Sequence, residues 1–181
     1  MKRKFLYCLP GFILMFTIFS CREQTSTTTA SEPVTTKTED ATAKNIEVLR
    51  NFYTLFEKGD WAAIEKLAAP DFIDHSPMMP TGSMNSRDSV MKYLKMNKEA
   101  FPDLKFEVLH IAADGDYVFA HYHFIGTNTG PYMGMPATNK KLDYTGIDLV
   151  RMKDGVAQEH WDYGDNITYM KQMGMMPEPK K

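Results

Sequence analysis

The sequence predicts an α+β fold in which helices come first and an antiparallel sheet follows. Between residues 45 and 100, apolar side chains recur in several segments at the spacing of amphipathic helices. Residues 104–163 instead show strand patterns separated by turns and one long loop. This order is typical of a domain in which helices cover one face of a sheet. We expect the curled sheet and its helices to form a cone with an open mouth and a pocket inside.

The N-terminal segment is expected to lie outside this fold. Residues 1–20 join three basic residues to an apolar run that is short for a membrane span, which is typical of a secretory signal peptide. The run ends in Ile18-Phe19-Ser20-Cys21, which resembles a bacterial lipobox. We therefore expect lipid on Cys21 and a cell-envelope location, either periplasmic or surface-exposed. An uncleaved anchor helix and a plain signal peptide are the alternatives.

Composition bounds the rest of the chain. Residues 21–43 are rich in Thr, Ser, Glu and Ala without any aromatic residue, so we expect a flexible tether after the lipidated cysteine. Residues 44–178 have the length of a single domain. The only other cysteine, Cys8, lies in the predicted signal peptide, so the mature chain has no internal disulfide and no Cys-based zinc site. The net charge of -2 gives little support to a nucleic-acid partner.

Three helices are predicted before the sheet, each with local start or stop signals. They cover residues 45–58, 61–69 and 86–100. Gly59 can end the first helix, and Asp60 can cap the second, which Pro70 stops. Ser86 can cap the third. Between the last two helices, residues 71–75 form a short extended piece.

Four strands and a final helix follow. The strands are predicted over residues 104–113, 117–127, 142–152 and 156–163, and the helix over residues 165–174. A tight turn around Gly115 joins the first two strands, and Lys153-Asp154-Gly155 joins the last two. Residues 126–140, with three glycines and two prolines, are predicted to be a long loop.

Five motifs lie in order within residues 45–176. They are FYTLFEKGDW, FIDHSP, FPDLKFEV, GTNTGPYMGMPATNKKLDYTGIDLVRMKDG, and EHWDYGD with MKQMG behind it. Together they resemble the SnoaL-like polyketide cyclase (ester cyclase) family of the nuclear transport factor 2-like superfamily. The resemblance implies the cone-shaped fold and intramolecular aldol ring closure without metal or cofactor. It also implies that Asp165, in the pattern Trp161-x-x-x-Asp165, is the acid/base. The chain departs from the family at His121 and Asn128, where Arg and His are frequent.

The stretch EHWDYGD supplies the predicted centre of the site. Alternation along the last strand puts one set of residues on a common face, which we expect to line the pocket. This set comprises Glu159, Trp161, Tyr163 and Asp165. His160 and Asp162 then belong to the outer surface. Burial beside aromatic rings would raise the pKa of Asp165 toward useful base strength. The alternative is that Asp165 simply caps the last helix.

Other candidates lie on neighbouring segments. His75 could donate to a ligand oxygen, or could bond to a loop carbonyl. Glu159 could be a second acid/base, or could pair with Arg151. His121 and His123 form an H-x-H pair that could chelate zinc, but the sequence supplies no third ligand, so we expect pocket lining and no metal. Further lining residues are expected to be Phe119 and Met133.

We therefore expect a lipid-anchored SnoaL-like enzyme of the ester cyclase or isomerase type. Asp165 and His75 would be catalytic, the ligand would be small and apolar or carbonyl-containing, and no cofactor would be needed. The alternative is a non-catalytic lipoprotein of the same fold that binds a hydrophobic ligand, which the lipid anchor favours. A third possibility is a domain that forms homodimers through the other face of the sheet.

Overall fold

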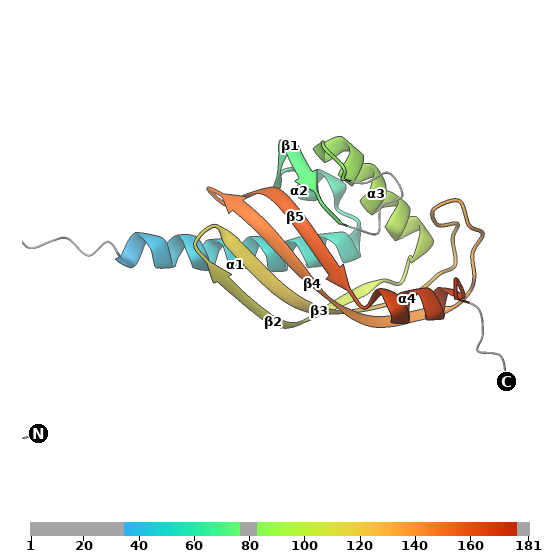
Figure 1. Cartoon of the computed structure of the whole chain (residues 1–181). Helices are drawn as coiled ribbons and strands as arrows, with labels where there is room; N and C mark the ends of the chain where they lie inside the picture. Colours follow the sequence, from blue (N-terminus) through green and yellow to red (C-terminus); the bar gives the residue numbers. More distant parts are fainter. Residues whose placement is uncertain (1–34, 77–82, 177–181) are drawn as a thin grey trace, which may run out of the picture. The chain divides into compact units, whose positions relative to one another are not determined.

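The computed structural model describes residues 35–76 and 83–176, with side chains from residue 39 onward. It contains a curved five-stranded sheet with helices packed against it (Figure 1). The predicted α+β class is confirmed. The predicted signal peptide and Cys21 lie outside the described residues. Within the described ranges, no helix combines the length and hydropathy that crossing a membrane requires.

The elements follow the predicted order. They are α1 (Thr35–Lys58), α2 (Trp61–Glu65), β1 (Ala68–Asp74), α3 (Arg87–Ala100), β2 (Lys105–Asp114), β3 (Tyr117–Thr127), β4 (Lys141–Lys153), β5 (Val156–Gly164) and α4 (Asn166–Met173). The sheet order is β1-β5-β4-β3-β2. β1 pairs with β5 in parallel, and the other neighbours are antiparallel. α1 packs along β2 and β3, α3 contacts β1, and α4 contacts β4 (Figure 1).

Local capping signals act where the sequence predicts them. The Ser86 side chain accepts a hydrogen bond from the Ser89 amide at the start of α3, and Asp60 does the same for Ala63 at the start of α2. Gly59, after α1, has a φ of 72°, a left-handed conformation that favours glycine. These helix boundaries depend on nearby residues alone, which is why the sequence predicts them.

Two helix boundaries differ from the prediction. α2 ends at Glu65 rather than at residue 69, because the Ala157 amide donates to the Leu67 carbonyl at 2.8 Å and draws the following residues into β1. α1 begins at Thr35, so the part of the predicted tether from that residue onward is helical. This extension contains neither proline nor glycine, the strongest helix breakers.

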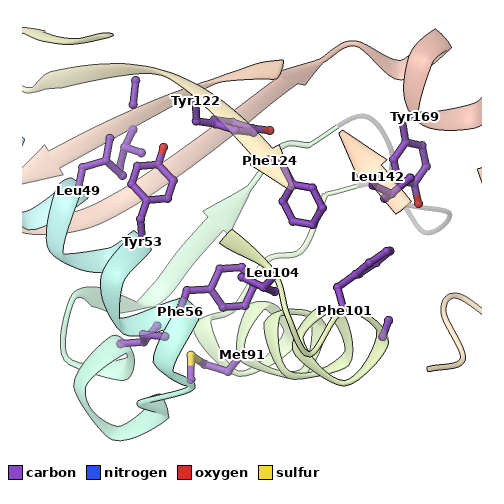
Figure 2. Packing of buried hydrophobic residues seen from close by; sticks show 14 of the residues in the cluster. Leu49, Tyr53, Phe56, Met91, Phe101, Leu104, Tyr122, Phe124, Leu142 and Tyr169 are labelled. Atoms are coloured by element: carbon purple, nitrogen blue, oxygen red, sulfur yellow. The ribbon is translucent and has the colours of Figure 1, made fainter. Parts of the chain in front are cut away.

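The core fills the space between the helices and one face of the sheet, here called the inner face. On β3 this face carries Val118, Ala120, Tyr122 and Phe124, all buried. Figure 2 shows Tyr53 and Phe56 of α1 near Tyr122 and Phe124, with Phe101 and Leu142 farther along. Val118 and Ala120 are small, so α1 can approach β3 closely.

The opposite, outer face of β3 was predicted to line the pocket, and this prediction is wrong. Tyr117 and Phe119 are 40% and 43% exposed. Apolar residues occupy both faces of β3, so alternation alone leaves the choice of buried face open. Packing of the helices decides which face of β3 is buried, because the small side chains of β3 lie on the face that α1 contacts.

Candidate functional site

A cavity of about 170 Å³ lies between the helices and the inner face of the sheet. Most of its wall is apolar, and its polar part comes mainly from acidic, imidazole and phenol groups, together with Ser76, Arg87 and Asn97. The main polar residues are Tyr53, Asp74, Tyr93, Tyr122, Tyr144, Asp148, His160 and Asp162. They come from α1, α3 and all strands except β2. An apolar cavity with a few converging polar groups is the usual form of a small-molecule site.

Two carboxylates stand opposite each other in the sheet. Asp148 of β4 pairs in register with Asp162 of β5, and both face the cavity. Burial, and then the charge of Asp148, raise the pKa of Asp162 to about 6. The hydrogen bond from Tyr122 acts in the opposite direction. Asp162 is therefore a carboxyl group that gains and loses a proton close to neutral pH.

A glycine makes room for the contact between Tyr122 and Asp162. The Tyr122 side chain extends from β3 over β4, and its hydroxyl donates to Asp162 Oδ1 on β5 at 2.8 Å. It crosses β4 at Gly146, where a Cβ atom would collide with the Tyr122 hydroxyl. Only glycine at this position leaves space for the phenol ring in its present place.

His160 joins two buried aspartates beside Asp162. Its Nδ1 lies 3.0 Å from Asp74 Oδ2, and its Nε2 lies 2.9 Å from Asp148 Oδ1. Asp148 also accepts from the Tyr53 hydroxyl, and Asp74 accepts from the Ser76 amide at 2.8 Å. Each oxygen of the two carboxylates thus has a donor, which is the condition for burying such charges.

The protonation of His160 follows from this geometry. Burial would lower its pKa, but the hydrogen bonds and charges of Asp148 and Asp74 outweigh burial and raise the pKa well above its usual value. For Asp74, burial would raise the pKa, but His160 and Ser76 hold it below its usual value. His160 is thus an imidazolium between two carboxylates. Its side chain is 21% exposed because it borders the cavity.

The structure places Asp165 at the start of α4 and not in the cavity wall. Its carboxylate accepts from the Thr168 amide at 3.0 Å and from the Thr168 hydroxyl at 2.7 Å. These bonds hold the pKa of the exposed Asp165 below its usual value. The predicted cap is confirmed, and the prediction that Asp165 faces the pocket is wrong.

The other predicted residues of EHWDYGD lie on the outer face. Glu159 accepts from Arg151 Nε at 2.9 Å, so the predicted alternative of an ion pair is confirmed. Its second oxygen lies 2.9 Å from His75 Nε2, and the His75 ring stacks on Trp161 with centroids 4.7 Å apart. Tyr163 is 59% exposed. None of these side chains lines the cavity, because this part of the strand presents His160 and Asp162, the alternate residues, to the cavity.

The remaining candidates also lie away from the cavity. His123 Nε2 is 2.6 Å from Asp143, and the ring of His121 stacks on His110 at 5.8 Å. Phe119 is exposed beside them, and Met133 packs on the core. Among residues 35–76 and 83–176, no group of three or more His, Cys, Asp or Glu side chains is placed to hold a metal ion.

Sequence reasoning missed the residues that line the polar end of the cavity. It assigned His160 and Asp162 to the outer surface and did not single out Asp74, whereas Asp74 is buried and all three line the cavity. One signal was available. Asp148 sits inside the apolar run of β4, between Ile147 and Leu149, and a charge in such a run needs partners.

Comparison with known proteins agrees with the family resemblance of the sequence motifs. Residues 46–173 match the profile of a family described as SnoaL-like polyketide cyclase. The aklanonic acid methyl ester cyclase DnrD of Streptomyces peucetius is 21% identical over 130 residues, which cover 71% of this chain and 90% of DnrD.

Solved structures share the fold. AclR from Streptomyces galilaeus superposes with a TM-score of 0.66 at 26% identity, over 77% of this chain and 87% of AclR. A SnoaL-like protein from Jannaschia sp. CCS1 reaches a TM-score of 0.69 at 18% identity, over 76% of this chain and 96% of that protein. The predicted cone-shaped fold is confirmed by these similarities.

Proposed function

Since this chain belongs to the SnoaL-like polyketide cyclase family, we propose that it is a small-molecule cyclase or isomerase that uses Asp162 as general acid/base at a carbonyl compound. One observation carries the proposal: Asp162 is a cavity-lining carboxyl group with a pKa of about 6. A catalytic base is most effective when its pKa lies near the operating pH. An apolar cavity that holds such a group has the features of an active site.

The proposed chemistry needs one proton carrier. The Asp162 carboxylate removes a proton from a carbon next to a carbonyl group, and the electron pair of the broken C–H bond forms an enolate. The enolate carbon then attacks a second carbonyl group of the same molecule, which forms a C–C bond and an alkoxide. Protonated Asp162 returns its proton to the alkoxide, so the base is regenerated and the ring is closed.

The residues around Asp162 have supporting roles in this proposal. His160 and Tyr53 bind the carboxylate of Asp148, which faces Asp162, and Asp74 holds the other ring nitrogen of His160. The charge of Asp148 raises the pKa of Asp162. A carboxylate held in this way makes its neighbour a stronger base than an aspartate in water.

The test compares two aspartates that lie three residues apart. Asp162→Asn and Asp165→Asn remove the same charge, the first inside the cavity and the second outside it. The assay follows deuterium exchange at the α-carbon of methyl acetoacetate by NMR, after subtraction of the buffer rate. We expect Asp162→Asn to lose roughly 100-fold or more of the exchange rate, the typical contribution of general acid/base catalysis. Asp165→Asn should retain the rate. Undiminished exchange in a folded Asp162→Asn variant would refute the proposal.

The second candidate is the predicted non-catalytic binding domain. Two observations favour it: Asp165 is occupied as a helix cap, and the cavity is mostly apolar. The pKa of Asp162 argues against it, because binding an apolar ligand does not require a buried titratable carboxyl group. The exchange assay separates the two functions, since a binding domain shows no exchange above the buffer rate in either the parent chain or the variants.

We also propose that the domain is anchored through lipid on Cys21. The lipobox-like sequence and the preceding apolar run support this. The full chain should sediment with membranes, and Cys21→Ser should release it or leave its signal peptide uncleaved. Equal labelling of the parent chain and of Cys21→Ser by a clickable fatty acid would contradict the anchor.

A further inference from the structure

We infer that Tyr144 is a further catalytic residue, whose hydroxyl group donates a hydrogen bond to the carbonyl oxygen of a small, uncharged, enolisable substrate. This inference rests on the proposed function, because it assigns a role at the same site. Asp162 takes the proton from carbon, and Tyr144 binds the oxygen on which the negative charge develops.

The first observation is that the Tyr144 hydroxyl is free. Four tyrosines line the cavity, and three of them have assigned partners. Tyr53 donates to Asp148, Tyr93 shares a hydrogen bond with Tyr132, and Tyr122 donates to Asp162. Within the part of the chain that the structure describes, no hydrogen bond is formed by the Tyr144 hydroxyl. A phenol that borders an apolar cavity without a partner is available to a ligand.

The second observation is the position of the Tyr144 ring. Tyr144 lies on the inner face of β4, and its Cε2 is 3.4 Å from the place where Gly164 would carry a Cβ atom. Gly164 lies on β5, two residues from Asp162 and on the same face. The ring of Tyr144 therefore extends from β4 toward β5, the strand that carries Asp162.

Packing fixes this orientation. The Tyr144 ring lies 5.2 Å from Phe124 and meets Tyr169 edge-on at 5.8 Å. The pKa of Tyr144 is raised well above its usual value, first by burial and then by the charge of Asp162. Tyr144 thus keeps its proton at neutral pH, so its hydroxyl can donate a hydrogen bond to a ligand oxygen.

The chemistry of enolisation requires such a donor. When the C–H bond breaks, the negative charge moves to the carbonyl oxygen, and a donor already in place stabilises that charge more strongly in a dry site than water does. Tyr122 cannot serve, because its hydroxyl is bound to Asp162. Tyr144 therefore supplies the donor that the proposed reaction otherwise lacks among the cavity tyrosines.

Charge and size define the substrate class. The cavity already holds three acidic residues, namely Asp74, Asp148 and Asp162. The imidazolium of His160 is bound between two of them. The guanidinium of Arg87, which also lines the cavity, pairs with Glu65 at 3.3 Å, and its buried Nε has no hydrogen-bond partner within the described residues. Because both cations are already paired with carboxylates, an anionic substrate would meet net repulsion. A cavity of 170 Å³ is close in size to cavities of about 150 Å³ that bind benzene, so it suits a compound of about one small ring.

The experiment compares Tyr144→Phe with Tyr169→Phe in the full chain. Both remove one phenol oxygen from neighbouring rings, but Tyr169 does not line the cavity. The probe is 4-nitrophenol, which enters the cavity as the neutral phenol; when its proton passes to the Asp162 carboxylate, the charge of the site is unchanged and the bound phenolate, followed by its absorbance, resembles a planar enolate. We expect Tyr144→Phe to weaken binding about 10-fold or more, the effect of losing a hydrogen bond to a charged group. It should also slow exchange of methyl acetoacetate by about 100-fold. Tyr169→Phe should change neither.

The outcomes separate this inference from the proposed function. If Asp162→Asn abolishes exchange but Tyr144→Phe matches the parent chain in both assays, the inference is wrong and the proposed function stands. If Tyr144→Phe weakens probe binding while Asp162→Asn leaves exchange unchanged, the proposed function is wrong and Tyr144 is a binding residue only, which overturns its catalytic role. Tyr144→Phe is expected to fold normally, because the missing hydroxyl has no partner in the described residues. Thermal unfolding of the variant checks this.

Discussion

Asp148 and Asp162 face each other directly across β4 and β5, and both line the cavity. Like charges in opposite positions on neighbouring strands repel each other. Tyr53 and His160 bind both oxygens of Asp148, whereas within residues 35–76 and 83–176 Asp162 has a single hydrogen bond, from Tyr122. Two similar side chains thus have different properties: Asp148 is held by its partners, and Asp162 can exchange its proton near neutral pH.

Activity should rise with pH through the range in which Asp162 loses its proton. The base must be ionised, and its pKa is about 6, so the exchange rate should increase about tenfold per pH unit below 6 and level off above 7. The profile reports on Asp162 together with the groups that face it, namely Asp148, His160 and Tyr122. Measurement of kcat/KM from pH 4.5 to 8 checks this. An inflection near 4, the usual value for an aspartate, would contradict it.

Two substitutions should move this inflection in the same direction. The hydrogen bond from Tyr122 favours the charged form of Asp162, so its loss raises the pKa of Asp162. Tyr122→Phe removes the donor, and Gly146→Ala displaces it, because the new methyl group collides with the Tyr122 hydroxyl. Both should shift the inflection upward by roughly one pH unit or less, given about 1 kcal/mol for the bond.

The control for Gly146→Ala is Thr145→Ala, on the exposed face of the same strand. It should leave the pH profile in place. A downward shift of the inflection in either Tyr122→Phe or Gly146→Ala would contradict the expectation that the Tyr122 hydrogen bond lowers the pKa of Asp162.

Loss of His160 should destabilise the fold. His160→Gln leaves Asp74 and Asp148 buried without a cation, and removal of one partner from a buried ion pair costs about 3–5 kcal/mol. His160 has a raised pKa when folded, so its contribution is complete below 6.5 and is lost as the pH rises through the folded value. Asp74 has a lowered pKa, so its contribution is lost as the pH falls below 3.8.

The difference between the parent chain and His160→Gln should therefore be largest between about pH 4 and 6.5. Urea unfolding at several pH values measures it. The exposed His110 offers a matched control, since His110→Gln should change the free energy of unfolding by no more than about 0.5 kcal/mol. Equal stability of the two variants at pH 5 would argue against a charged His160.

Asp165 should matter for stability and not for proton transfer. Asp165→Ala removes the hydrogen bonds to the Thr168 amide and hydroxyl, and loss of an N-cap costs about 1 kcal/mol. Asp165→Asn, which can still cap, should cost less. Thermal unfolding and the pH profile together check this. A changed inflection in Asp165→Asn would return the acid/base role to this residue.

The sequence predicts features that depend on neighbouring residues and misses those that depend on packing. Ser86 and Asp165 cap helices as predicted, because a cap involves residues three apart. Gly115 forms the predicted turn with a φ of 55°. The inward direction of His160 and Asp162 is not a local feature of this kind. It depends on which face of β5 the helices cover, and the alternation of the strand contains no information on that choice.

The same limit explains the misplaced site. Trp161 and Tyr163 are large and aromatic, and would be assigned to a core on hydrophobicity alone. The helices instead pack on the face where β3 carries Val118 and Ala120, and the register of the sheet then turns Asp148 and Asp162 inward. One long-range packing choice thus moves the predicted acid/base by three residues along the chain.

Gly146 and Gly164 pair directly across β4 and β5, and each lies beneath a tyrosine ring. The height of the Tyr122 phenol above the sheet is therefore set by a position that carries no functional group. A methyl group at residue 146 would force the Tyr122 ring away from the backbone, whereas one at residue 164 would lie 3.4 Å from the Tyr144 ring, in ordinary van der Waals contact. In diverging relatives, glycine at residue 146 and tyrosine at residue 122 should be gained or lost as a pair, so the geometry of the proposed reaction would change through a residue that never meets the substrate.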